Sequence, residues 1–118
     1  MNKDKLVYLA LPFTAHPEKS FEIANKVAAK LMEQGVIVFS PISHSYPIAL
    51  EMSNKELMTS FEFWMSMDIP ILKRCDEMII IVIGKDGHKL IDESRGCQQE
   101  LKVAREKGMN INYYHYEE

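Results

Sequence analysis

The run "MIIIVIG" at residues 78–84 decides the fold of this chain. It consists of apolar, mostly β-branched residues closed by a glycine, which is typical of a strand buried on both faces. The run "LVYLAL" at 6–11 has the same character, and "VIVFS" at 36–40 and "NINYYHY" at 110–116 indicate two more strands. We therefore predict four strands, near 6–11, 36–40, 77–83 and 110–114.

Helical patterns separate these strands. After the first, Pro17 stands where a first helical residue belongs, and an apolar stripe then leads to Gly35, which closes the helix at about residue 34. Before the third strand, Ser53 and Glu56 form a capping box for a helix that runs into Trp64. Pro70 then either kinks this helix or restarts it.

The last helix is predicted from Ser94, a plausible N-cap, to Gly108. Two other segments show no apolar period. "PISHSYPIAL" (41–50) contains two prolines and "KDGHKLIDE" (85–93) is polar, so both are predicted to be loops.

The alternation of strands and helices predicts a fold class. We expect one α/β domain over residues 1–118, a flavodoxin-like three-layer sandwich with a four-stranded parallel sheet in the order 2-1-3-4. In such sheets ligands bind outside the carboxyl ends of the strands. The segments expected there are "PFTAHP" (12–17), "SPISHS" (40–45) and "GKDGHKLIDESRG" (84–96).

Composition excludes several classes of function. The chain has 118 residues and a net charge of −3, with no basic block that would favour nucleic acid or an anionic membrane as partner. Cys75 and Cys97 lie in apolar contexts and indicate buried, reduced thiols in a cytoplasmic protein. The four histidines lack metal-ligand spacing, and no dinucleotide or P-loop motif is present, so we expect neither metal nor cofactor.

Glu100 has an unusual place in the last helix. Cys97, Leu101 and Ala104 form the stripe expected to face the sheet, and Glu100 lies on its margin. Periodicity leaves two interpretations open. Glu100 is either a rim residue whose carboxylate reaches water, or a partly desolvated group at the ligand-binding edge.

Several short motifs together resemble one family. They are "VYLALPF" (7–13), "FSPISHS" (39–45), Trp64 with Asp68 and Asp76, and "SRGCQQE" (94–100). Over nearly the whole chain, their order and spacing resemble the nucleoside 2-deoxyribosyltransferase superfamily, and most closely its DUF1937 branch.

The resemblance implies a mechanism and three catalytic residues. Glu100 would be the nucleophile that attacks the anomeric carbon of an N-glycoside. Asp68 would engage the nucleobase, and Tyr8 would contact the sugar or the nucleophile. From the residues alone, Tyr8 could equally be a core aromatic, and Asp68 the N-cap of a helix that continues through Pro70. Asp76 is predicted to be structural.

The start of the last helix departs from the transferases. Ser94 stands where they carry an aspartate, and this resembles the deoxynucleoside 5′-monophosphate N-glycosidases, in which the serine serves the phosphate. Ser94, Gly96 and the free N–H groups of a helix start favour an anion, and Arg95 adds charge. Those hydrolases also carry a glycine-rich loop after the first strand, which "PFTAHPEK" (12–19) lacks.

The remaining candidates for ligand contact lie on the predicted loops. Pro12 and Thr14 follow the first strand, and His44 either assists departure of the base or stabilises its own loop. The predicted function is cleavage or transfer at the N-glycosidic bond of a nucleoside or its 5′-monophosphate, by a homo-oligomer. Trp64, the methionines near it and the tail "NYYHYEE" (112–118) are candidate subunit contacts. The alternative is a catalytically inactive protein that binds or sequesters nucleotides.

Overall fold

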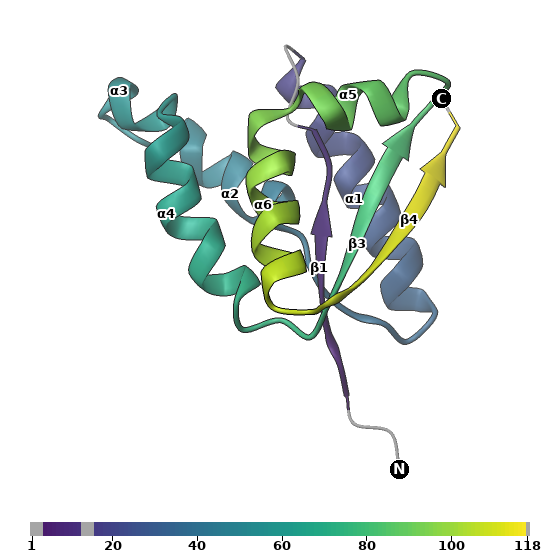
Figure 1. Ribbon diagram of the computed structural model, residues 1–118. Coiled ribbons are helices and arrows are strands. Elements are labelled where there is room, and N and C mark those ends of the chain that lie inside the picture. The colour runs from purple at the N-terminus through teal and green to yellow at the C-terminus, as the bar shows by residue number, and fades with distance from the viewer. Residues whose placement is uncertain (1–3, 13–15, 118) are drawn as a thin grey trace.

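The computed structural model describes residues 4–12 and 16–117, and four parallel strands form its sheet (Figure 1). The sheet has the order β2-β1-β3-β4, which confirms the predicted fold class. The strands are β1 (Leu6–Ala10), β2 (Ile37–Phe39), β3 (Glu77–Ile83) and β4 (Asn110–Tyr116). The strand order reverses between β1 and β3, and crevices for ligands form at such a point.

Helices cover both faces of the sheet. Val7 and Leu9 of β1 pack into the core under α1 (Pro17–Glu33), while Tyr8 and Ala10 point to the opposite core, which contains α6 (Arg95–Glu106). Figure 1 shows α1 behind the sheet and α6 in front of it. The strand periodicity therefore places the side chain of Tyr8 beneath α6.

The first predicted loop is a helix. Residues 41–50 form α2 (Pro41–Leu50), which contradicts the loop prediction. Pro41 occupies the first turn, where a missing N–H costs nothing. Pro47 lies inside the helix and is exposed; an interior proline normally costs about 3 kcal/mol. Tertiary contact offsets part of this cost, since Tyr46 packs on Phe21 of α1 with ring centroids 4.9 Å apart.

The second predicted loop is also partly helical, as α5 (Gly87–Glu93). Its first residue explains why a glycine-containing polar segment can fold this way. A Cβ at Gly87 would lie 2.4 Å from Val82 Cγ1 and 2.9 Å from the Val82 carbonyl carbon. Only glycine lets the first turn of α5 lie against the end of β3, and Ile91 then becomes buried.

The helix predicted after residue 53 is two helices. Asn54 caps α3 (Lys55–Met58) by accepting a hydrogen bond from Leu57 N, so the predicted Ser53–Glu56 capping box is wrong. Ser60 caps α4 (Phe61–Leu72) in the same way. Because α4 runs unbroken through Pro70, Asp68 lies inside a helix and is not an N-cap.

Other predicted features are confirmed. Pro17 begins α1, and Gly35 follows its end at a φ of 88° that favours glycine. The hydroxyl of Ser94 caps α6 by accepting a hydrogen bond from Cys97 N at 3.2 Å. Both cysteines are buried free thiols. Of the helices in residues 4–12 and 16–117, none has the length and apolarity that a membrane crossing needs.

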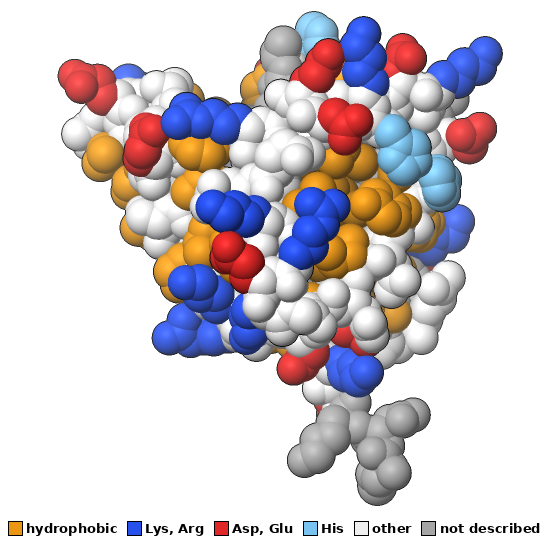
Figure 2. All heavy atoms as spheres, viewed as in Figure 1, with side chains coloured by type: hydrophobic (Ala, Val, Ile, Leu, Met, Phe, Trp, Pro, Cys, Tyr) orange, Lys and Arg blue, Asp and Glu red, His pale blue; other side chains and the backbone are white. Residues whose placement is uncertain are grey.

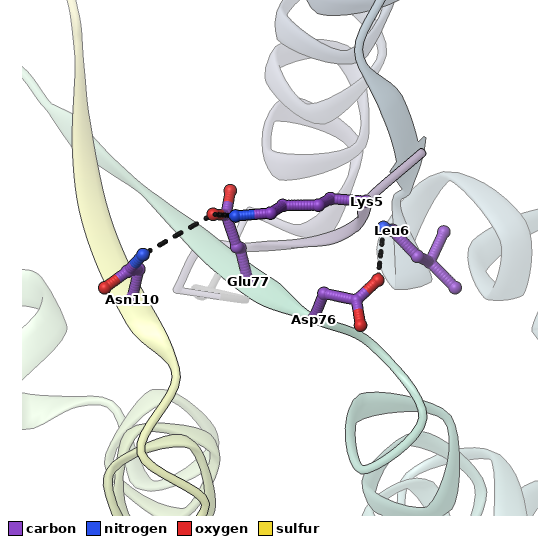
Figure 3. A network of polar contacts seen from close by, with 5 residues as sticks. All are labelled: Lys5, Leu6, Asp76, Glu77 and Asn110. Atoms are coloured by element: carbon purple, nitrogen blue, oxygen red, sulfur yellow. Dashed lines mark hydrogen bonds and ion pairs between the residues drawn. The ribbon is translucent and has the colours of Figure 1, made fainter. Parts of the chain in front are cut away.

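Polar contacts tie the strands together at their amino ends (Figure 3). Leu6 N donates to Asp76 Oδ2 at 2.8 Å, and Asp76 N donates to Leu6 O at 2.8 Å, which joins β1 to the start of β3. Glu77 Oε2 accepts from Lys5 Nζ at 3.2 Å and from Asn110 Nδ2 at 3.5 Å. Asp76 therefore has the structural role that the sequence predicted.

Candidate active site

A cavity of about 720 Å³ opens at the carboxyl end of β1, between α2, α4 and α6. Ala10, Leu11 and Pro12 at the end of β1 line it, together with Pro17 at the start of α1 and with residues of α2 to α6 and their connections. A volume of this size suits a small organic ligand. The cavity lies where the strand order reverses, as the fold class predicts.

Glu100 lies at the inner end of this cavity. It is in the second turn of α6, and its exposed fraction is 6%. Tyr8 is fully buried below it, and Tyr8 Oη donates to Glu100 Oε2 at 2.5 Å. Glu100 is thus a buried carboxyl group that faces a cavity, and its head does not reach bulk water as a rim residue would.

The surroundings of Glu100 perturb its ionisation. Burial raises the pKa of Glu100 to about 8, since desolvation disfavours the carboxylate. The hydrogen bond from Tyr8 lowers this pKa, and the negative charge of Asp68 raises it. Burial, followed by the charge of Glu100, raises the pKa of Tyr8 well above its ordinary value, so Tyr8 remains a hydrogen-bond donor.

Asp68 lines the cavity from α4. It is half-buried, and burial raises the pKa of its carboxyl group to about 6. Phe61, Trp64 and Met65 line the cavity from the same helix. These four positions have the spacing i, i+3, i+4 and i+7, so they form one face of α4.

The first turn of α6 forms another part of the wall, with Ser94, Arg95 and Gly96. The guanidinium carbon of Arg95 lies 3.8 Å from the ring centroid of Phe61, and Arg95 Nη2 pairs with Glu62 Oε2 at 3.2 Å. The N-terminus of a twelve-residue helix therefore meets the cavity here and favours anionic groups, while the charge of Arg95 is shared with Glu62, and Glu93 also lines this part of the cavity.

One predicted site residue is not brought to the cavity, and another, Thr14, lies outside the described residues. His44 is exposed on α2 and is not among the residues that line the cavity. Its ring lies 5.5 Å from that of Phe39, and its Nδ1 is 3.3 Å from Ser45 Oγ.

The sequence interpretation missed the side of the cavity formed by α2. Ile42, Ser45, Tyr46 and Ala49 line the cavity with the spacing i, i+3, i+4 and i+7. This helical stripe is present in the sequence, but the two prolines obscured it. A period count across the prolines would have indicated the helix and its inward face.

The match to a family model covers residues 5–116 and carries the description "Domain of unknown function (DUF1937)". The chain belongs to the DUF1937 family. No curated protein matches it by sequence.

Solved structures similar to the DUF1937 chain include two 2-deoxyribosyltransferases. For the enzyme from Bacillus psychrosaccharolyticus the TM-score is 0.64 at 24% identity, covering 93% of this chain and 72% of that one. For the enzyme from Leishmania mexicana the TM-score is 0.61 at 20% identity, covering 94% of this chain and 64% of that one. These likenesses establish a shared fold.

Proposed function

We propose that this protein cleaves or transfers at the N-glycosidic bond of a nucleoside or nucleoside 5′-monophosphate. The observation that carries the proposal is a buried glutamate that faces a cavity and accepts a hydrogen bond from a buried tyrosine, Glu100 with Tyr8. The similar 2-deoxyribosyltransferase structures support it, because their fold carries glycosyl transfer at nucleosides.

In the proposed reaction, an ionised oxygen of Glu100 bonds to the anomeric carbon while the carbon–nitrogen bond breaks. The electron pair of that bond leaves with the base, which takes a proton from the Asp68 carboxyl group. Water, or a second base, then attacks the anomeric carbon and releases the Glu100 carboxylate. When water attacks, its proton returns to Asp68, so both carboxyl groups end as they began.

Tyr8 and Asp68 have separate roles in this scheme. The hydroxyl of Tyr8 fixes one oxygen of Glu100, which orients the carboxylate and partly offsets the cost of its burial. Asp68 stands on the facing helix, where its raised pKa of about 6 keeps a share of it protonated near neutral pH. The two acids therefore act at different atoms of one substrate.

The first turn of α6 is the proposed site for the 5′ end of the substrate. The hydroxyl of Ser94 accepts from Cys97 N, and its own proton stays available for an anionic oxygen. A Cβ at Gly96 would meet only Met65 Cε, at 3.8 Å, so the fold itself leaves room beside this glycine. Ser94, Arg95 and Gly96 would thus hold a 5′-hydroxyl or a 5′-phosphate.

A panel of nucleosides and 5′-monophosphates tests the proposal directly. Incubation with the protein should release free base, and rapid quenching should yield a Glu100-containing peptide heavier by one deoxyribosyl or deoxyribosyl phosphate group. Release of base without this adduct would exclude the covalent step. Release from no member of the panel would exclude the activity on those substrates.

A second candidate function is binding or sequestration of nucleotides without turnover. One observation favours it: a carboxyl group with a pKa of about 8 is mostly protonated near neutral pH and is then a poor nucleophile. The same panel separates the two functions, since a sequestering protein would bind members of the panel and return them unchanged.

Self-association is proposed as well. Leu57 and Met67 on α3 and α4 are 39% and 46% exposed and do not line the cavity. Figure 2 shows hydrophobic side chains over this part of the molecule, on the left of the view. Light scattering at high concentration should give a mass above that of one chain, and Met67→Ser should lower it; a strict monomer would contradict the proposal.

A further inference from the structure

The side of the cavity that faces α6 is formed largely by hydrocarbon and aromatic rings. Ile42, Ala49 and Leu50 of α2 lie along it, with Met58 of α3 and Phe61 and Met65 of α4. This surface, the α2–α4 wall, is continuous with the part of the cavity that holds Glu100 and Asp68. A ligand attached to the sugar at Glu100 would therefore extend along it.

Several polar groups on the α2–α4 wall already have partners within the chain. Trp64 Nε1 donates to Met58 O at 2.7 Å, and Thr59 Oγ1 donates to Lys55 O at 3.2 Å. Ser45 Oγ is paired with His44 Nδ1 at 3.3 Å. Among the described side chains of this side of the cavity, Asp68 supplies the one carboxyl group, and the other side-chain oxygens are the hydroxyls of Ser45, Tyr46 and Thr59.

We infer that the base held by this site carries an apolar substituent, such as an alkyl or benzyl group, on its exocyclic amine. The inference rests on the proposed function for the place of the sugar and of Asp68. It goes beyond that function by naming the class of base.

The chemistry follows from counting hydrogen bonds. An unsubstituted exocyclic amine presents two N–H groups, and a buried N–H without an acceptor carries the full cost of its desolvation. A substituted amine keeps one N–H for Asp68 and replaces the other with hydrocarbon. The substituent then covers the α2–α4 wall, and the burial of its hydrocarbon surface strengthens binding.

Binding can be measured apart from turnover, because Trp64 is the single tryptophan of the chain and lies in the cavity wall. Its fluorescence should be followed while wild-type protein and Glu100→Gln are titrated with 2′-deoxyadenosine and with N6-benzyl-2′-deoxyadenosine, each with and without a 5′-phosphate. We expect the benzyl compounds to bind at least about tenfold more tightly than their unsubstituted counterparts. In parallel, wild-type protein should release the substituted base with the higher kcat/KM.

A pair of variants shows whether the α2–α4 wall causes the preference. Leu50 lines the cavity and Ile48 does not, and the two are 55% and 48% exposed on the same helix. Leu50→Ser should reduce the ratio of the two affinities severalfold, whereas Ile48→Ser should preserve it. Both positions are exposed, so neither change should prevent folding.

The possible outcomes are distinct. Tight binding of the benzyl compounds without release of base would support this inference and would exclude the proposed activity on them. Equal or weaker binding of the benzyl compounds, or binding of neither kind, would overturn the inference even if base were released. A lower mass by light scattering for Leu50→Ser, with an unchanged affinity ratio, would assign the α2–α4 wall to a second copy of the chain instead.

Discussion

Acidic residues lie at both ends of the sheet, but their surroundings differ between the two ends. At the amino ends of the strands, Asp76 and Glu77 accept hydrogen bonds that join β1, β3 and β4 (Figure 3). At the carboxyl ends, Glu100 is buried beside a cavity and has a raised pKa. The first pair stabilises the sheet, while the second site keeps a carboxyl group in surroundings that oppose its charge. Such opposition is characteristic of functional sites.

The largest effect should come from removing the nucleophilic charge at the carboxyl end. Glu100→Gln keeps the shape and still accepts from Tyr8, but it cannot form the ester. We expect base release to fall by several powers of ten. Glu106→Gln, on the exposed face of the same helix, is the matched control and should change little. Equal rates for Glu100→Gln and wild type would show that Glu100 is not the nucleophile.

The same variant, which should lose activity, should gain stability relative to wild type at high pH. Glu100 has a pKa of about 8 when folded and an ordinary pKa of 4.5, so between these values the folded state binds the extra proton. The free energy of unfolding of wild type should therefore decrease as pH rises from about 4.5 to about 8, and then level off. At about 1.4 kcal/mol per pKa unit, the upper bound of this loss is about 5 kcal/mol.

Urea unfolding at pH 5 and pH 9 measures this linkage. Glu100→Gln has no group to titrate, so its stability relative to wild type should be greater at pH 9 than at pH 5, whereas Glu106→Gln should follow wild type at both. A difference between wild type and Glu100→Gln that does not depend on pH would mean that the carboxyl group is not held in an unfavourable environment.

A smaller, destabilising effect is expected at the amino end. Asp76→Ala removes the acceptor of the Leu6 N–H. Because this hydrogen bond is exposed, we expect a loss of about 0.5–1.5 kcal/mol in the free energy of unfolding. Asp76→Asn keeps an oxygen that can accept this bond, so it should lose less. Thermal unfolding of wild type, Asp76→Ala and Asp76→Asn at one pH provides the measurement. A gain in stability for Asp76→Ala would contradict the stabilising role of this carboxylate.

The smallest effect on stability should come from the ion pair between Lys5 and Glu77, which lies next to Asp76. The side chains of Lys5 and Glu77 are 59% and 23% exposed, so solvent screens their attraction. Lys5→Ala should change the free energy of unfolding by less than about 1 kcal/mol, and added salt should reduce the difference further. A larger loss that persists in high salt would indicate a contribution from the Lys5 stem and not from its charge.

The fold was predictable where the local pattern and the tertiary structure agree. The β-branched run of β3 and the apolar stripe of α1 give the correct elements, since each buries a continuous apolar surface. Local reasoning failed at α2 and α5, where packing overrides the residues that usually break helices. Tyr46 on Phe21 stabilises a helix that contains Pro47, and Gly87 permits a contact with Val82 that no sequence pattern displays.

For the site, periodicity placed Glu100 at the margin of a buried stripe but could not determine its exposure. That depends on Tyr8, which is 92 residues away in the sequence and lies below Glu100 only because β1 and α6 pack together. The side of the cavity formed by α2 was missed because the segment was predicted to be a loop. The role of Glu100 is a prediction that the variants above test, and the roles of Tyr8 and Asp68 stay predictions.

The placement of α2, α3 and α4 has a consequence for how this protein could diversify. These helices form one uninterrupted stretch, residues 41–72, between β2 and β3. Tyr8 and Glu100 lie outside it. Apart from Asp68, the proposed chemistry and the proposed recognition of the base therefore belong to separable parts of the chain. Exchanging residues 41–72 between family members should transfer the choice of ligand as a unit, so that selectivity can be inherited independently of reactivity.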